Sequence, residues 1–408
     1  MNVKQSALHK MKTLVFFNLY IVTMFVSMAS SASVKRVFAP KFPEESLSAS
    51  EIIAFYGYPS ESHYVKTDDG YILTLHRIPH GLFKPSNGKT VYLQHGLLDS
   101  SAAFLMNPPQ QSLGFILADE GYDVWLGNSR GNTYSSKHIN LTTKNKEFWD
   151  FSFDEMAKYD LPASINYVLK KSNKTDLFYV GHSQGTTIGF IAFGENKELA
   201  TKIRAFIALA PVATVKHIRG AIKTISTFTT EIELLIKIFG LNDFLPQSYF
   251  MRFLAQDICG LSHSAEIVCS NVAFLISGFD VSNLNKTRLP VYMSHLPAGT
   301  SSKDMIHFAQ MIKSGKFQMF DYGKSGNIKR YNQEFAPLYN ISKVKVPVAL
   351  FTGTNDWLSD PTDVNTNLRP FLPNIVFSKN IDAWNHVDFI WGIDANKMIY
   401  EDIIKLMN

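Results

Sequence analysis

The sequence predicts an α/β fold in which helices cover both faces of a mostly parallel central sheet. Short apolar runs rich in Val, Ile, Leu and Phe recur along the chain, and roughly 30 to 50 residues between several of them leave room for crossover helices. The segment GHSQG at residues 181–185 directly follows one such run. The runs stop between about Val212 and Tyr339, which indicates a helical insertion.

The first residues have the order of a secretory signal peptide. Three lysines precede an apolar run over residues 14–28, and small residues follow at 29–33. We therefore expect residues 1–32 to be a signal peptide and residues 33–408 to be the folded domain. An uncleaved membrane anchor is the alternative, but the run is short for a span and Asn18 interrupts it.

The composition is that of a globular protein. The 408 residues are 46% hydrophobic, and 40 Lys and Arg against 35 Asp and Glu give a formal charge of +5. The predicted signal peptide carries three of the lysines and no acid, so the remainder has 37 basic and 35 acidic groups. No nucleic-acid partner is expected, because such binding needs a concentrated basic face.

Glycosylation sequons and cysteines agree with export into an oxidising lumen. Only two cysteines occur, and a disulfide between Cys259 and Cys269 would close a small loop; in the alternative both are free and buried. No Cys/His cluster has metal-ligand spacing, so no metal site is expected. The four sequons begin at Asn140, Asn173, Asn285 and Asn340.

The strands of the sheet are predicted from these apolar runs. A hairpin comes first, from His63 to Pro79, with a turn at Asp68-Asp69-Gly70. The strands predicted after it are Thr90–Leu93, Asp123–Leu126, Leu177–Val180, Ala205–Leu209, Val348–Phe351 and Ile375–Phe377.

The interval at about residues 212–339 is predicted to form a cap over the strand tips. Its apolar residues follow helical spacing around residues 232–239. Ligands of open α/β sheets bind beyond the carboxyl ends of the strands, so such an insertion would cover the site. The alternative is a separate domain with its own core.

The GHSQG segment predicts a serine nucleophile. A nucleophile elbow consists of a strand, a strained turn and a helix, and residues 186–193 can continue as the helix. Glycines flank Ser183 because the turn brings neighbouring backbone too close for a Cβ. The alternative is a Gly-Ser turn without chemistry.

A serine hydroxyl needs a base, and the expected order along the chain is Ser, acid, His. His386 is the only histidine after the strand predicted at Val348, so it is the predicted general base. Asp356, a few residues after that strand, is the predicted acid. Asp360 and Asp363 remain close competitors, although an Asp there could simply cap the next helix. The other histidines after Ser183 lie in the predicted insertion: His217, His263, His295 and His307.

Two backbone N–H groups are candidate donors to a tetrahedral oxyanion. One belongs to Gln184, the residue after the nucleophile, and the other to Leu97 in the loop after an early strand. His95 lies in the wrong part of the chain order for catalysis, so we expect it to support that loop by hydrogen bonds.

Long motifs in the right order make the sequence resemble the acid lipases of the gastric and lysosomal type, within the α/β-hydrolase fold. The resemblance covers nearly all of residues 33–408. Its motifs are YGYP at 56–59, residues 69–79, HGLL at 95–98, GNSRGN at 127–132, residues 148–161, PAGT at 297–300, NDWL at 355–358 and HVDFIW at 386–391.

The resemblance implies a Ser183–Asp356–His386 triad with Leu97 and Gln184 as the oxyanion hole. It also implies hydrolysis of neutral lipid esters, such as triacylglycerols and sterol esters, without a cofactor, and a helical cap with a lid. One departure is Ser277, which stands where such lipases often have a third cap cysteine.

The expected function is therefore that of a secreted or lysosomal lipase acting on lipid esters at a lipid–water interface. After signal cleavage no transmembrane anchor is expected. Two alternatives remain open at this point: a catalytically inactive lipid-binding relative, and an esterase of small soluble esters.

Overall fold

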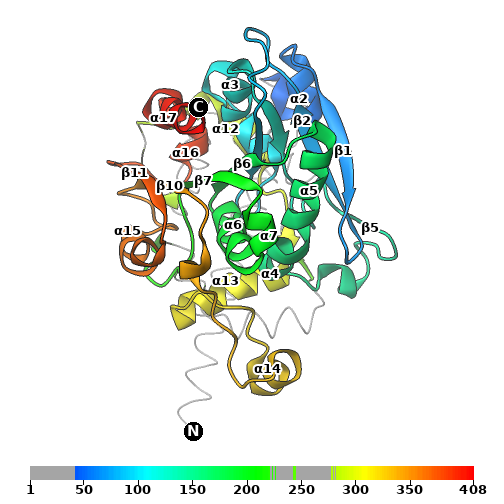
Figure 1. Ribbon diagram of the computed structural model, residues 1–408, viewed down its shortest axis with the longest axis vertical. Helices are drawn as coiled ribbons and strands as arrows, with labels where there is room; N and C mark the ends of the chain where they lie inside the picture. The colour runs from blue at the N-terminus through cyan, green and yellow to red at the C-terminus, as the bar shows by residue number, and fades with distance from the viewer. Residues whose placement is uncertain are drawn as a thin grey trace, which may run out of the picture. The chain divides into compact units, whose positions relative to one another are not determined.

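A computed structural model describes most of the chain after the predicted signal peptide (Figure 1). The described residues are 42–220, 242–244, 277–278 and 282–408, together with residues 223, 226 and 280. The predicted signal peptide, both cysteines, His263 and the helical pattern at 232–239 lie outside the described residues, so these expectations stay predictions.

The described residues form a nine-stranded sheet in the order β1-β2-β4-β3-β6-β7-β10-β11, with β5 paired to β2. Strands β1, β2 and β5 pair in antiparallel fashion, and all pairs from β4 to β11 are parallel. The strands are β1 (Glu61–Lys66), β2 (Tyr71–Ile78), β3 (Thr90–Gln94), β4 (Asp123–Leu126), β5 (Lys137–His138), β6 (Leu177–His182), β7 (Ile203–Leu209), β10 (Val348–Gly353) and β11 (Ile375–Ile381). The predicted mostly parallel sheet is confirmed.

Helices pack on both faces of this sheet, as Figure 1 shows. Alternation along β3 explains the two layers, because side chains of successive strand residues point to opposite faces. Val91 and Leu93 join one buried cluster and Tyr92 joins the other. The first cluster includes residues of α2 (Ala49–Phe55), α3 (Leu113–Asp119), α12 (Leu289–His295), α16 (Asp388–Trp391) and α17 (Glu401–Met407). The second includes residues of α5 (Leu161–Ser172), α6 (Gln184–Glu195) and α7 (Lys197–Ala200).

The hairpin and the six later strands form where the sequence predicts them, and most extend one to four residues further. Strand β5 was not predicted, because its two residues carry no apolar run. A small antiparallel sheet of β8 (Asp243–Phe244) and β9 (Thr300–Ser301) inside the predicted insertion was not predicted either.

Helices are the main regular structure in the described part of the predicted insertion. It contains α12, α13 (Ser302–Ser314) and α14 (Gly323–Tyr331). Leu289, Val291 and Tyr292 of α12 are fully buried in the core beside α16 and α17, so this helix also contributes to one layer of the sheet domain. The predicted bounds of a cap at 212–339 remain a prediction.

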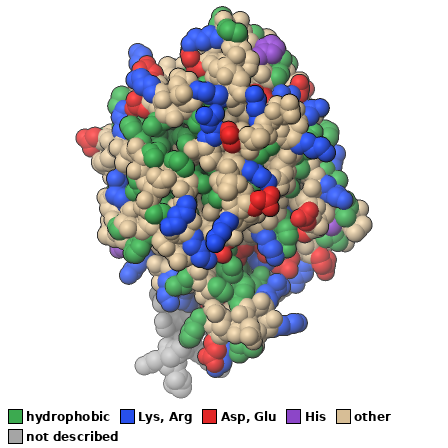
Figure 2. Space-filling model, viewed as in Figure 1, with side chains coloured by type: hydrophobic (Ala, Val, Ile, Leu, Met, Phe, Trp, Pro, Cys, Tyr) green, Lys and Arg blue, Asp and Glu red, His purple; other side chains and the backbone are tan. Residues whose placement is uncertain are grey.

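No helix within the described ranges combines the length and the apolarity that a membrane span requires. On the face shown in Figure 2, blue basic side chains are interspersed with red acidic ones.

Candidate active site

Ser183 lies at the junction of β6 and α6, as the elbow pattern predicts. Its backbone is strained, with φ 54° and ψ −121°, and its N–H donates to the carbonyl of Leu209 at 3.0 Å. A non-glycine residue in such a conformation costs about 1–3 kcal/mol and persists only where the surroundings enforce it. The strain directs the hydroxyl away from the strand, at the carboxyl edge of the sheet.

The flanking glycines have the steric reason that the sequence suggested. A Cβ on Gly181 would lie 2.8 Å from the carbonyl carbon of Gly185. A Cβ on Gly185 would lie 2.4 Å from the carbonyl oxygen of Gln94, at the end of β3. The start of α6 therefore packs directly on the neighbouring strand, and only glycine allows this approach.

His386 reaches the serine from the loop between β11 and α16. Its Nε2 lies 2.7 Å from Ser183 Oγ, although 203 residues separate them in sequence. Two backbone contacts hold this histidine: its N–H donates to Ser277 O at 3.1 Å, and its carbonyl lies 2.9 Å from His182 Nε2. Ser277, noted above as a departure from the family pattern, thus helps to hold His386 through its main-chain carbonyl.

Of the three candidate acids, Asp356 faces His386. Both of its carboxylate oxygens lie 2.9 Å from His386 Nδ1, and the side chain is fully buried. Its Oδ1 also accepts the N–H groups of Leu358 and Ser359, at 2.9 and 2.8 Å. These donors fix the carboxylate in one orientation.

The two competing acids have other partners. Asp360 caps the following helix by accepting the N–H of Thr362, and it pairs with Arg219 Nε at 2.9 Å. Asp363 accepts the hydroxyl of Thr214 and the N–H of His217. Helix capping, the alternative role expected for either acid, is therefore found for Asp360, whereas Asp363 binds the segment at residues 214–217 instead.

Three histidines of the predicted insertion are held away from the serine by other bonds. Nδ1 of His217 lies 3.2 Å from Asp363. The Nε2 atoms of His295 and His307 lie 2.8 and 2.9 Å from backbone carbonyls.

The loop after β3 lies against the serine. A Cβ on Gly96 would be 3.0 Å from the Cβ of Ser183, so Gly96 lies in contact with the elbow. Leu97 is the next residue of the loop. Leu98 has a left-handed φ of 60°, and its carbonyl accepts the N–H of Ala298 at 2.6 Å. The loop and the first turn of α6 are therefore neighbours, which is the arrangement that two oxyanion donors require.

Two buried histidines support this region as neutral rings. His95 accepts the N–H of Ser129 at Nε2, 3.0 Å away, and its Nδ1 lies 2.7 Å from Gly96 O, so its expected loop-supporting role is confirmed. Burial lowers its pKa to about 4. Burial and the nearby His386 lower the pKa of His182 to about 3.

Asp304 is a site residue that sequence reasoning missed. It lies on α13, is fully buried, and its Oδ2 accepts a hydrogen bond from Gln184 Nε2 at 2.7 Å. The two residues are 120 positions apart, and no local pattern in the sequence links them.

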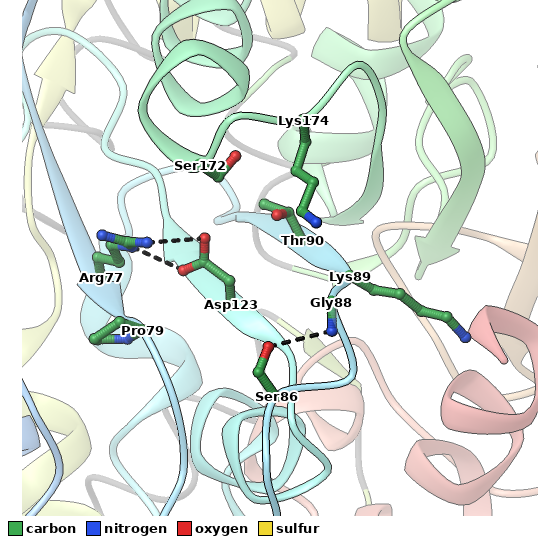
Figure 3. Close-up of a pocket in the computed structure, with 9 residues that line it drawn as sticks. All are labelled: Arg77, Pro79, Ser86, Gly88, Lys89, Thr90, Asp123, Ser172 and Lys174. Atoms are coloured by element: carbon green, nitrogen blue, oxygen red, sulfur yellow. Dashed lines mark hydrogen bonds and ion pairs between the residues drawn. The ribbon is translucent and has the colours of Figure 1, made fainter.

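A polar cavity of about 260 Å³ lies elsewhere, at the amino ends of β3 and β4 (Figure 3). Thr90 and Asp123, the first residues of these strands, line it, and Arg77 pairs with Asp123 inside it at 2.8 Å. Ser183 follows the carboxyl end of β6, so this cavity is not part of the serine site.

The four sequon asparagines can all be reached from solvent. Asn140, Asn173 and Asn340 are exposed, and Asn285 is half-buried. Their glycosylation remains a prediction.

Comparison with known proteins assigns the family. A family model described as a partial alpha/beta-hydrolase lipase region matches residues 49–108, and a model of the alpha/beta hydrolase fold matches residues 89–250. Rat gastric triacylglycerol lipase is 50% identical over 90% of this chain and 93% of its own length. The chain belongs to the gastric and lysosomal acid lipase family. This acid lipase is also 47% identical to the lysosomal acid lipase/cholesteryl ester hydrolase of Macaca fascicularis, over 96% of this chain and 98% of the relative.

Solved structures show the same fold at low sequence identity. A putative lipase from Sulfolobus solfataricus superimposes with a TM-score of 0.57 and 14% sequence identity, over 85% of the present chain and 93% of the solved one. A monoglyceride lipase from Saccharomyces cerevisiae superimposes with a TM-score of 0.51 and 17% sequence identity, over 86% of the present chain and 95% of the solved one. The α/β-hydrolase fold predicted from the sequence is therefore confirmed.

Proposed function

We propose that this acid lipase hydrolyses ester bonds of neutral lipids through an acyl-enzyme formed on Ser183. The continuous contact from Ser183 through His386 to Asp356, at 2.7 and 2.9 Å, is the observation that supports it most. The names of its relatives, gastric triacylglycerol lipase and lysosomal acid lipase/cholesteryl ester hydrolase, favour triacylglycerols and sterol esters as substrates.

The proposed reaction begins with proton transfer. Ser183 Oγ attacks the ester carbonyl carbon while His386 Nε2 takes its proton. Asp356 holds Nδ1–H, which fixes the tautomer that leaves Nε2 free to accept, and it stabilises the imidazolium that forms. The backbone N–H groups of Leu97 and Gln184 bind the oxyanion; loss of one such donor typically costs about 3 kcal/mol of transition-state stabilisation.

The two products leave in separate steps. The imidazolium of His386 protonates the departing alcohol, and the acyl group stays on Ser183. Water then enters, His386 removes its proton, and the second tetrahedral intermediate collapses to release the fatty acid. The same side chain thus serves as base and acid in turn.

We also propose a place of action in the secretory pathway, either outside the cell or in the lysosome. The signal-peptide pattern, the four sequons and the relatives named gastric and lysosomal support this proposal. A lipid–water interface would present the substrate.

The decisive experiment compares the wild type with Ser183→Ala on emulsified triacylglycerol, on a cholesteryl ester and on a short soluble ester, at acid and at neutral pH. We expect the variant to keep its melting temperature and to lose hydrolysis of all three. A serine-directed phosphonate should label only the wild type. Full activity of the variant would overturn the mechanism. A wild type that hydrolyses only the short ester would favour an esterase of small soluble esters. A wild type without any turnover would favour an inactive lipid-binding protein.

A further inference from the structure

Asp304 of α13 connects the predicted insertion with the first residue of α6. Its Oδ2 accepts from Gln184 Nε2 at 2.7 Å and from Thr300 Oγ1 at 2.9 Å. Its Oδ1 accepts the N–H of Phe153, at the start of α4 (Phe153–Glu155), at 2.9 Å. Its own N–H donates to Ser301 Oγ at 3.0 Å.

These four contacts make Asp304 a rigid point of attachment. The side chain is fully buried, and besides Gln184 the carboxylate is bonded by Thr300 of β9 and by Phe153 of α4, while the backbone N–H is bonded by Ser301 of β9. A hydrogen bond to a carboxylate in such a dry position is stronger than one at the surface. The Gln184 side chain is therefore fixed by a partner that cannot easily move.

The position of Gln184 makes this attachment relevant to the chemistry. Its N–H is one of the two proposed oxyanion donors. Along the chain it lies between Ser183, whose backbone is strained, and Gly185, which packs closely on Gln94. Donors must lie within about 0.5 Å of the productive geometry, and packing together with supporting hydrogen bonds provides such precision.

We propose that Asp304 is a positioning residue: it holds Gln184 by its side-chain amide and thereby keeps the Gln184 N–H aimed at the oxyanion. Asp304 does not touch the substrate or the reacting atoms. The inference rests on the proposed function, because it assigns the oxyanion role to Gln184.

The contacts can be kept by a neutral side chain as well as by a carboxylate. Burial raises the pKa of Asp304 to about 6, with nearby Asp154 adding to the effect. If Oδ2 carries a proton or is replaced by an amide nitrogen, rotation of the Gln184 amide by 180° presents its Oε1 as the acceptor. A protonated Oδ2 gives its single hydrogen to Gln184 and still accepts from the Thr300 hydroxyl, whereas the NH₂ group of Asn donates to both; in either case the Phe153 N–H still meets Oδ1.

The test uses the full-length protein with Asp304→Ala and Asp304→Asn. We expect Asp304→Ala to lower kcat for a soluble p-nitrophenyl ester by about tenfold to a hundredfold, with KM within about twofold. Inactivation by a serine-directed phosphonate, which forms a tetrahedral adduct, should slow by a similar factor. Asp304→Asn should restore both rates to within about threefold of the wild type.

Asp154 provides a matched control. It is a half-buried carboxyl of the same region, and it accepts the N–H of Phe320 at 2.9 Å and the hydroxyl of Tyr339 at 2.6 Å. Asp154→Ala should lower the melting temperature about as much as Asp304→Ala and leave kcat unchanged. A purely structural effect would instead lower kcat equally in both variants.

A second variant keeps the proposal falsifiable if Asp304→Ala does not fold. Gln184→Met breaks the same hydrogen bond from the other end and leaves the bonds of Asp304 to Phe153 and Thr300 in place. It should lower kcat and phosphonate inactivation as Asp304→Ala does. Folded Gln184→Met or Asp304→Ala with wild-type rates, or Asp304→Asn as slow as Asp304→Ala, would overturn the positioning role. Failure of the proposed function is seen separately, as an active Ser183→Ala variant.

Discussion

Replacement of Asp356 by Asn reverses the hydrogen-bond polarity on which the proposed base depends. Oδ1 already accepts from Leu358 and Ser359, so the amide oxygen of Asn would keep that place and its NH₂ group would face His386 Nδ1. Nδ1 must then act as an acceptor, and the ring proton moves to Nε2. There it points at Ser183 Oγ, 2.7 Å away, and the ring can no longer take the serine proton.

The expected loss is therefore large although the side chain barely changes. The wrong tautomer of such a histidine lowers kcat by about 10⁴, which corresponds to about 5.5 kcal/mol. The change keeps the volume and the two backbone hydrogen bonds of the carboxylate, so the melting temperature should move by no more than a few degrees.

The assay is steady-state hydrolysis of a soluble p-nitrophenyl ester, with stopped-flow measurement of the acylation burst. Asp360→Asn and Asp363→Asn are matched controls, because the sequence alone left these two acids open. Both should keep kcat within about threefold of the wild type. The assignment would be wrong if Asp356→Asn stayed within tenfold of the wild type, or if either control lost as much activity.

Two further predictions concern the fit and the charge of the site. Gly96→Ala should lower kcat by about tenfold or more with little change in melting temperature, because the added Cβ would lie 3.0 Å from the Cβ of Ser183. An unchanged kcat in a soluble ester assay would contradict the close contact between the loop and the elbow. Burial raises the pKa of Asp388 to about 8, so the folded state keeps a proton that the unfolded state releases above about pH 4, and stability is lost as the pH rises from about 4 to 8. Asp388→Asn removes this loss, at up to about 1.4 kcal/mol per pKa unit. Thermal melting should show the variant more stable than the wild type at pH 7.5 and similar to it at pH 4; equal stabilities at pH 7.5 would refute the effect.

Local sequence patterns were sufficient where one short segment determines its own structure. The apolar run Leu177–Val180 can form a strand buried on both faces, and the two glycines of GHSQG permit the close contacts of the elbow. Chain order then singled out His386 among the later histidines. Position alone could not separate Asp356 from its neighbours, because all three acids follow the same strand and only the direction of each side chain distinguishes them.

Contacts between distant segments left no such pattern. Arg130 lies in the GNSRGN stretch, but nothing there shows that its buried guanidinium pairs with Asp69 at 2.6 Å and with Asp160 at 2.7 Å. Asp304 reads as an ordinary residue in the first turn of a helix, where an acid is favoured by the helix dipole. Its second function depends on where the sheet brings α6, and that follows only from the assembled fold.

The predicted insertion also bonds to three segments of the proposed active site, whether or not it covers the substrate. The N–H of His386 donates to Ser277 at 3.1 Å, the N–H of Ala298 donates to Leu98 in the oxyanion loop at 2.6 Å, and Asp304 accepts from the first side chain of α6 at 2.7 Å. Each bond reaches a different part of the proposed catalytic site, and each arises from a different place in the insertion. Since a shift of about 1 Å at a reacting group can cost a hundredfold in rate, displacement of the insertion would disturb base, loop and elbow together. We therefore expect variants that loosen these three contacts to lower kcat even on small soluble esters, whose access no cap restricts.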